Sequence, residues 1–184
     1  CTGTARLPPP TALSVLRRQR PVLTAQHDSP SRQALFLAGE PLDETTAQWV
    51  SGALNVPIID NYWQTESGWP ILSLCNGVQK QHSKFGSPGL PTYGYNVKLL
   101  DEVTGDELQG AQKKGVVVIE GPLPPGCLQT VWRDDTRFVN TYWKSVPGKL
   151  VYNTFDWGIR DEDGYFFILG RTDDVINVAG HRLG

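Results

Sequence analysis

The chain has 184 residues, of which 39% are hydrophobic, and its 17 basic and 19 acidic residues give a net charge of −2. This length suits one compact domain, or one domain and the start of another, and the charge excludes the basic surface typical of proteins that bind nucleic acid or anionic membranes. The cysteines, Cys1, Cys75 and Cys127, lack C-x-x-C spacing and are odd in number, which excludes a disulfide framework and favours a reducing compartment.

The two ends of the sequence predict an internal piece of a longer protein. The chain contains no Met, and residues 1–10 have the pattern of neither a secretory signal nor a transit peptide. No apolar run approaches the roughly 18 residues of a membrane helix. We expect no membrane or nucleic-acid partner, and a location in the cytoplasm, with the mitochondrial matrix as the alternative.

The first half of the chain has the pattern of a βαβ unit. Residues 34–38 (ALFLA) and 56–59 (VPII) are short apolar runs typical of buried strands, and a helix opened by Pro41 and Asp43 separates them. This order predicts two parallel, neighbouring strands. A further helix is predicted over residues 10–19. The expected apolar faces are Ala12, Leu13, Val15 and Leu16 in that helix, and Ala47, Val50, Ala53 and Leu54 in the second.

The second half changes to a β-rich pattern. Residues 96–100 and 116–120 flank a turn-rich segment and predict antiparallel strands. A short helix over 134–143 carries Phe138 and Tyr142. Residues 149–155 and 165–169 are β-rich runs on either side of DWGIRDEDG, in which Asp163–Gly164 predicts a hairpin turn. The expected class is α/β, with a parallel βαβ portion followed by a mostly β part.

Candidate binding residues follow both strands of the βαβ unit, where ligands of parallel sheets bind. Gly39, Glu40 and Pro41 follow the first strand, and their flat backbone suits a planar base. DNYWQTESG (60–68) follows the second strand, where Thr65 suits a phosphate oxygen and Glu66 suits Mg²⁺. The alternative is ordinary packing of aromatic side chains at the rim of the sheet, with a solvent-facing acid.

A second group of candidates lies near the end of the chain. Asp156 comes at the end of an apolar run, where it suits a ribose diol or caps a turn. Arg171 suits a sugar–phosphate contact or a salt bridge to a nearby acid. His181 has no partner at metal-ligand spacing and is interpreted as structural.

The order of these motifs resembles a known family. GEP, DNYWQTESG, FDWG and DEDGYFFILGRTDDVINVAGHRLG together are similar to the acyl-CoA synthetase branch of the adenylate-forming enzymes, and LFLAGEPLD, KFGSPG and GPLPPG are similar to its short-chain members. The resemblance runs from about residue 10 to residue 184. It implies a ligase that uses ATP with Mg²⁺ to convert propionate or acetate to an acyl-adenylate, and then transfers the acyl group to coenzyme A.

The same resemblance implies a role for each matching residue. The adenine wall would comprise Gly39, Glu40, Pro41, Asp60, Asn61 and Tyr62, continued along the nucleotide by Trp63, Gln64 and Thr65. Glu66 would hold Mg²⁺, Asp156 the ribose diol, and Arg171 the ribose and phosphate, with Thr65, Glu66 and Arg171 as catalytic groups. Trp63 and Ala38 would form the acyl pocket, Asp173 the hinge, and Ala179, Gly180 and Arg182 would approach coenzyme A and the nucleotide.

The resemblance also implies a domain division and some missing parts. Residues 1–9 stay unassigned, 10–170 would end the large AMP-binding domain, and 171–184 would be the hinge and the start of a small domain. The family's phosphate loop and catalytic lysine have no match in this sequence, so we expect the chain alone to be inactive. Two alternatives remain: an adenylating domain for another carboxylic acid, against which Trp63 argues, and a non-catalytic nucleotide-binding remnant.

Overall fold

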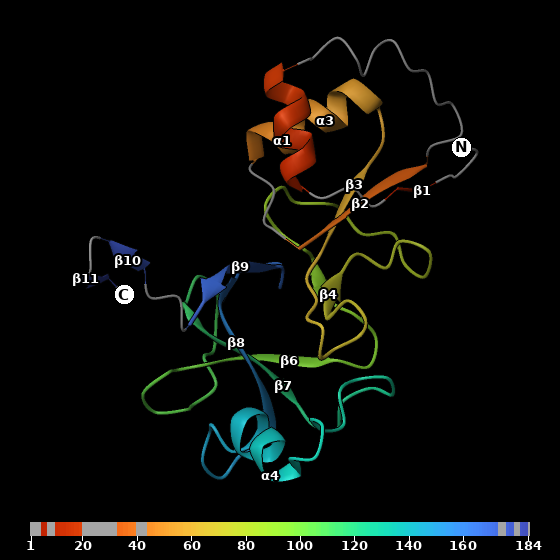
Figure 1. Cartoon of the computed structure of the whole chain (residues 1–184). Helices are drawn as coiled ribbons and strands as arrows, with labels where there is room; N and C mark the ends of the chain where they lie inside the picture. Colours follow the sequence, from red (N-terminus) through yellow and green to blue (C-terminus); the bar gives the residue numbers. More distant parts are fainter. Residues whose placement is uncertain are drawn as a thin grey trace. The chain divides into compact units, whose positions relative to one another are not determined.

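The computed structural model describes residues 5–6, 10–19, 33–39, 44–172, 176–178 and 181–183. The chain forms two compact units, Cys1–Thr92 and Tyr93–Gly184 (Figure 1). A parallel sheet lies in the first unit and an antiparallel four-stranded sheet in the second, which confirms the expected α/β class. Within the described ranges, no helix is long and apolar enough to cross a membrane.

The first unit is built on a parallel sheet with the strand order β1-β2-β3. Its elements are β1 (Ala5–Arg6), α1 (Pro10–Gln19), β2 (Ala34–Ala38), α3 (Glu44–Leu54), β3 (Ile58–Asn61), β4 (Leu72–Ser73) and β5 (Leu90–Pro91). β2 pairs in parallel with β3, from Leu35 opposite Ile58 to Ala38 opposite Asn61. The predicted βαβ unit is therefore confirmed, with α3 as the crossover that parallel strands require. β4 and β5 form a separate antiparallel pair.

The core of this unit lies between the sheet and its helices. Leu35 and Leu37 alternate along β2 and are 3% and 0% exposed, and they pack in one cluster with Leu13 of α1 and Val50 of α3. The apolar faces predicted for α1 and α3 include residues that are exposed in the structure, so this part of the prediction is wrong. They are Val15 and Leu16 in α1 and Ala53 in α3.

The contact between α1 and α3 explains which face is buried. Leu13 and Arg17 lie one turn apart on α1, and Arg17 Nη1 donates a hydrogen bond to Thr46 Oγ1 over 3.1 Å. Thr46 is 1% exposed and completes the buried face of α3. The buried face of α3 therefore includes a hydrogen-bonded threonine, which a search for apolar residues in the sequence does not identify.

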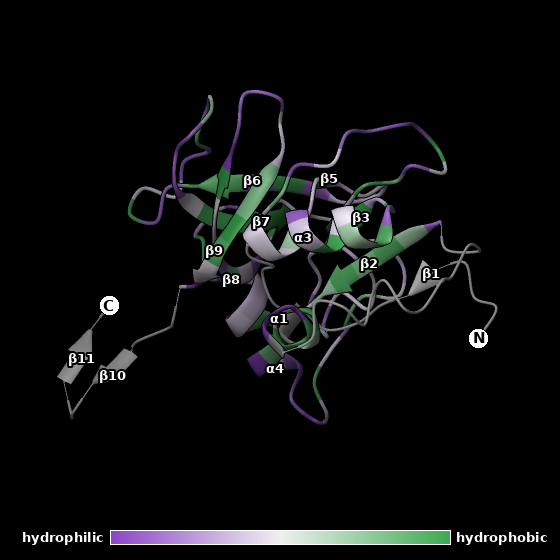
Figure 2. Ribbon diagram, turned by 90° about the horizontal axis from the view of Figure 1, so that it is seen from above, coloured by the Kyte–Doolittle hydropathy of each residue, from purple (hydrophilic) through white to green (hydrophobic). Residues whose placement is uncertain are grey.

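The second unit is built on an antiparallel sheet with the strand order β6-β7-β8-β9. Its elements are β6 (Asn96–Leu100), β7 (Gly115–Glu120), α4 (Asp135–Phe138), the π-helix η1 (Val139–Trp143), β8 (Val151–Arg160), β9 (Phe166–Arg171), β10 (Ile176–Val178) and β11 (His181–Leu183). β6 and β7 pair from Asn96 opposite Glu120 to Leu100 opposite Val116, as predicted. Figure 2 shows β6, β7 and β9 coloured mainly as hydrophobic strands.

β8 is longer than the sequence suggests. The segment Asp156–Arg160 was interpreted as part of a turn, but it continues the strand and pairs with β9. The hairpin turn itself is shorter: Asp161 Oδ1 accepts hydrogen bonds from the backbone N–H groups of Asp163 and Tyr165. Buried and half-buried residues alternate along Asp156–Gly158, as expected for a strand at the centre of a sheet.

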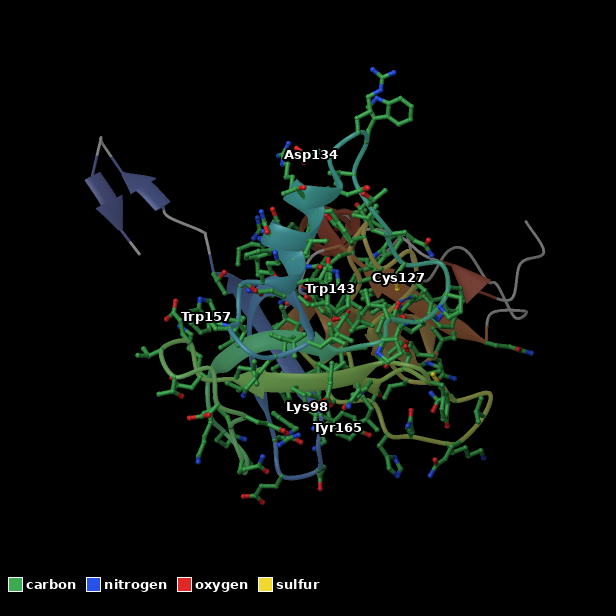
Figure 3. All side chains as sticks on the ribbon, turned by 90° about the horizontal axis from the view of Figure 1, so that it is seen from below. Lys98, Cys127, Asp134, Trp143, Trp157 and Tyr165 are labelled. Carbon is green, nitrogen blue, oxygen red and sulfur yellow. The ribbon has the colours of Figure 1, made fainter. Side chains whose placement is uncertain are left out.

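The predicted helix over 134–143 is present, but its second half is a π-helix. Asp134 caps it, because its carboxylate accepts a 2.9 Å hydrogen bond from Arg137 N. Figure 3 labels Asp134 and Trp143 at the two ends of this segment. The wider turn brings Tyr142 against β8, where its ring stacks on Tyr152 with 5.2 Å between centroids and a 5° interplanar angle. π-helical turns often mark functional sites.

Candidate functional site

The carboxyl ends of β2 and β3 lie side by side, as predicted for the two candidate segments. Ala38 is the register partner of Asn61, and Leu37 is the partner of Asp60. Gly39 follows β2 with φ +95°, in the left-handed region that glycine adopts without a steric cost, so the chain turns sharply at the rim. Glu40 and Pro41 lie outside the described residues.

The Asn61 side chain ties these two strand ends together. Its Nδ2 donates to the carbonyl oxygens of Leu37 (2.8 Å) and Ile59 (3.1 Å), and its Oδ1 accepts from Ser73 Oγ (2.6 Å). Both amide hydrogens are therefore used by the backbone of the sheet. Asn61, which is expected at the adenine, thus also links the two strand ends, and its partner Ser73 belongs to no motif of the sequence.

Asp60 is the titratable group most perturbed at this rim. Burial raises the pKa of its carboxyl from 3.8 to about 6, and the hydrogen bond from Asn61 N, 2.8 Å from Oδ1, opposes that rise. Lys84 and Ser87 line a small cavity beside it. The carboxyl is therefore about half ionised near pH 6 and gains the rest of its negative charge above that pH.

The loop after β3 is closed at its base and braced at its centre. Tyr62 N donates to Leu72 O (3.0 Å) and Ile71 N donates to Tyr62 O (2.8 Å). Ser67, 5% exposed, accepts from Gln64 N (3.0 Å), and its hydroxyl lies 2.8 Å from both Gln64 O and Trp69 O. The loop is thus held largely by its own hydrogen bonds.

This closed loop presents two indole rings to one apolar groove. The groove has a volume of about 710 Å³, within the usual range for ligand pockets. Phe36 and Ala38 reach it because they alternate with Leu35 and Leu37, which face the helices. Six of its lining residues are Phe36, Ala38, Ile59, Trp63, Trp69 and Leu74.

The groove brings together the two residues expected at an acyl pocket, Trp63 and Ala38. Trp63 is 46% exposed, so its ring is free to contact a ligand. The sequence reasoning assigned no role to Trp69, which is 66% exposed and lines the same groove. The signal in the sequence is local: two tryptophans lie six residues apart around Ser67–Gly68, where the chain turns.

Thr65 and Glu66 lie in the turn at the tip of the loop. Thr65 is exposed and Glu66 is half-buried. Among the residues that the structure describes, no group of three or more His, Cys, Asp or Glu side chains comes together. A half-buried carboxylate such as that of Glu66 would suit Mg²⁺, which is held by one or two carboxylates together with water and substrate phosphates.

In the second unit, Asp156 and Arg171 lie directly opposite each other. Asp156 is in the middle of β8 and Arg171 ends β9, and they are register partners. Opposite residues of antiparallel strands project from the same face. Asp156 is 6% exposed, whereas Arg171 is exposed, and Arg171 Nη1 donates to Thr154 O over 3.3 Å. Asp156 does not cap a turn.

Two irregularities in the sheet flank Asp156. The pairing with β7 passes from Val117–Asp156 to Val118–Asn153, so Thr154 and Phe155 form a bulge, in which Thr154 Oγ1 donates to Val117 O over 2.7 Å. The pairing with β9 shifts between Trp157 and Gly158. Phe155 has φ +59°, in the left-handed region that a bulky side chain seldom adopts. Bulges of this kind re-aim a side chain, here the Asp156 carboxylate.

The remaining candidates lie near the end of the chain, where the structure describes only some of the residues. Asp173, Ala179 and Gly180 lie outside the described residues. Arg182 is in β11, where its backbone pairs with Asn177. Their roles stay predictions.

Comparison with known proteins agrees with this geometry. Residues 4–128 match the family described as AMP-binding enzyme. The chain is 63% identical over 175 residues to propionate–CoA ligase from Escherichia coli (strain K12), which covers 95% of this chain and 28% of that protein. It is 38% identical over 179 residues to the mitochondrial acyl-CoA synthetase short-chain family member 3 of Homo sapiens, covering 95% of this chain and 25% of the other.

A solved structure extends the comparison to the fold. The crystal structure of the anthranilate CoA ligase AuaEII in complex with anthranoyl-AMP matches with a TM-score of 0.76 and 25% identity, over 98% of this chain and 32% of that one. The chain belongs to the AMP-binding enzyme family. It spans about a quarter of the length of the curated relatives it matches. The family match begins at residue 4 and therefore includes β1, which pairs with β2. β1 lies within residues 1–9, which have no assignment from the sequence alone.

Proposed function

We propose that this chain forms the acyl pocket and much of the nucleotide site of an AMP-forming acid–thiol ligase for short-chain carboxylates, propionate or acetate. The observation that carries the proposal is the apolar groove at the ends of β2 and β3, which Trp63 and Ala38 line together. Its similarity to propionate–CoA ligase supports the same substrate class.

In the first half-reaction, a carboxylate oxygen of the acid attacks the α-phosphorus of ATP, and the bond to pyrophosphate breaks. Catalysis at phosphorus requires positioning and neutralisation of charge. Asp156 would accept hydrogen bonds from the ribose diol, and Arg171 and Thr65 would contact phosphate oxygens. The direct opposition of Asp156 and Arg171 supports a division in which the anion binds the sugar and the cation the phosphate.

Glu66 would hold Mg²⁺ at the tip of the loop. The ion supplies charge neutralisation at the phosphates when it is bound. A half-buried carboxylate within a turn would suit an ion that water and phosphate oxygens also hold. Glu66 would therefore orient the nucleotide through the ion rather than act as a proton donor.

In the second half-reaction, the sulfur of coenzyme A attacks the acyl carbon and AMP leaves. Ala179, Gly180 and Arg182 would approach the reactants at that stage, after rotation at Asp173. The phosphate loop and lysine that the family uses at phosphorus have no match in these 184 residues. The isolated chain would therefore bind ligands without completing the reaction.

The first test is a calorimetric titration of the chain with propyl-AMP, a stable stand-in for the acyl-adenylate. We expect binding by the wild type and at least a tenfold weaker Kd for Asp156→Ala, about 1.4 kcal/mol. Glu162→Ala, on the exposed hairpin turn, is the matched control and should bind normally. If the wild-type chain is folded but binds no propyl-AMP, the proposal is wrong for this chain.

A second titration tests the chain-length limit. Trp63→Gly should gain affinity for hexyl-AMP relative to propyl-AMP, because loss of the indole opens the groove to a longer chain. One extra methylene in a pocket with room contributes only about 1–3 kcal/mol, so steric exclusion by the ring must dominate the discrimination. An unchanged preference in the Trp63 variant would favour the alternative of an adenylating domain for a different acid.

A further inference from the structure

We propose that Phe155 is a positioning residue, whose ring holds the Arg171 guanidinium beside Asp156 so that the guanidinium meets the phosphate of a bound nucleotide. This inference rests on the proposed function for the identity of the ligand. It assigns a task to a residue for which neither the motifs nor the comparisons provide one.

The backbone of Phe155 is held in an unfavourable conformation. A φ of +59° is unfavourable for an L-residue with a Cβ, because the Cβ comes too close to the following carbonyl oxygen. Its N–H donates to Asn153 Oδ1 (2.8 Å), and its carbonyl accepts from Thr172 N (2.8 Å). Such strain persists only where surrounding contacts determine it, and it clusters at functional sites.

The Phe155 ring contacts both an aromatic side chain and Arg171. The Phe155 and Tyr142 rings pack edge to face, with 6.1 Å between centroids and an angle of 68°. Tyr142 is itself stacked on Tyr152, which is 2% exposed. Arg171 Cζ lies 5.8 Å from the centroid of the Phe155 ring, within cation–π range. The π-helix, β8 and β9 thus meet at this one ring.

Arg171 gains a defined position from these contacts. An exposed arginine loses rotamer entropy when a ligand immobilises it. The ring contact and the hydrogen bond from Nη1 to Thr154 O restrict it beforehand. A guanidinium fork suits a phosphate, whereas the adjacent Asp156 carboxylate repels one and accepts from hydroxyl groups.

A purely structural role for Phe155 makes a different prediction from a positioning role. Loss of a packing residue would weaken every ligand of the site to a similar degree. Loss of a support for Arg171 would weaken ligands that carry a phosphate and spare those that lack one. AMP and adenosine differ by that phosphate alone, so the ratio of their affinities separates the two roles.

The experiment measures Kd for AMP and for adenosine by calorimetry on the full chain. Phe155→Leu should weaken AMP about five- to tenfold and change adenosine less than twofold, whereas Phe155→Tyr should behave as the wild type. Phe167→Leu is the control, because Phe167 is half-buried on the same strand as Arg171 but pairs with Ile159. If Phe155→Leu does not fold, Phe155→Met retains a long apolar side chain without a ring and carries the same expectation.

A cycle with Arg171→Lys completes the design. If Phe155 acts through Arg171, the double variant loses no more AMP affinity than Arg171→Lys alone. Equal losses for AMP and adenosine, or no loss in a folded Phe155→Leu, would overturn the inference and leave the proposed function standing. A wild-type chain that binds neither compound would instead overturn the proposed function, and the inference with it.

Discussion

Each unit has one segment with several candidate residues: the loop of residues 62–72 in the first, and the segment 153–157 of β8 in the second. The two segments are held in place in opposite ways. The loop is braced by hydrogen bonds among its own residues, centred on Ser67. The β8 segment is distorted: it has bulges against both neighbours and a left-handed Phe155. Its shape is maintained by rings and backbone from β9 and the π-helix.

This difference indicates where each region is vulnerable. A loop held from within fails when one of its own hydrogen-bonding groups is removed, and the rest of the unit stays folded. A distorted strand at the centre of a sheet fails when its neighbours no longer fit, so a change there affects the whole sheet. The π-helix and the left-handed residue are irregularities of the kind found where structure serves a site.

The largest effect is expected at Gly158, next to the distorted segment. A Cβ at this position would lie 2.7 Å from Val117 Cγ2 and 3.3 Å from the carbonyl oxygen of Phe167, so Gly158→Ala requires the Val117 side chain or the neighbouring backbone to shift. We expect a loss of about 1–3 kcal/mol in the free energy of unfolding, measured with urea.

The control for Gly158→Ala is the same substitution at Gly52 in α3, where a Cβ meets nothing within 4 Å. Alanine favours a helix over glycine by up to about 1 kcal/mol, so Gly52→Ala should stabilise the chain. Equal effects of the two substitutions would show that the close packing at Gly158 is not what fixes the strand.

A smaller effect is expected at the centre of the loop. Ser67→Ala leaves the Gln64 N–H without its side-chain acceptor in a buried position, which should cost about 1–2 kcal/mol. Near-UV circular dichroism should change as well, because Trp63 and Trp69 lose a fixed orientation. Ser83→Ala, at an exposed serine, provides the control and should leave both signals unchanged.

The effect that develops most gradually concerns pH and Asp60. The folded pKa of about 6 lies above the ordinary 3.8, so the native state binds a proton that the unfolded state has released. Stability is therefore fully present below about pH 4, falls as the pH rises from about 4 to 6, and is level above that. The loss is at most about 1.4 kcal/mol per pH unit within that range.

Asp60→Asn removes this titration and should flatten the stability profile between pH 4 and pH 7. The measurement is urea unfolding at a series of pH values, with Glu162→Gln on the exposed turn as control. An unchanged slope in Asp60→Asn would mean that another group titrates in that window.

Much of the fold follows from the sequence because its signals are local. The apolar runs 34–38 and 56–59 and the helix between them predicted parallel neighbours, and Ala38 is indeed the partner of Asn61. The expected antiparallel strands and the Asp163–Gly164 hairpin are confirmed as well. Parallel pairing also brought Ala38 and Trp63 to one groove, since strand ends determine where the following residues lie.

Tertiary structure alone decided the features that depend on distant partners. The buried place of Thr46 depends on Arg17, and the strand conformation of Asp156–Arg160 depends on pairing with β9. The left-handed Phe155 depends on Tyr142 and Arg171, which come from other elements. Propensity favours none of these, because their energies arise from contacts between residues far apart in the chain. The sequence by itself determined which elements form and which strand ends meet, and packing between elements decided how the site residues are held.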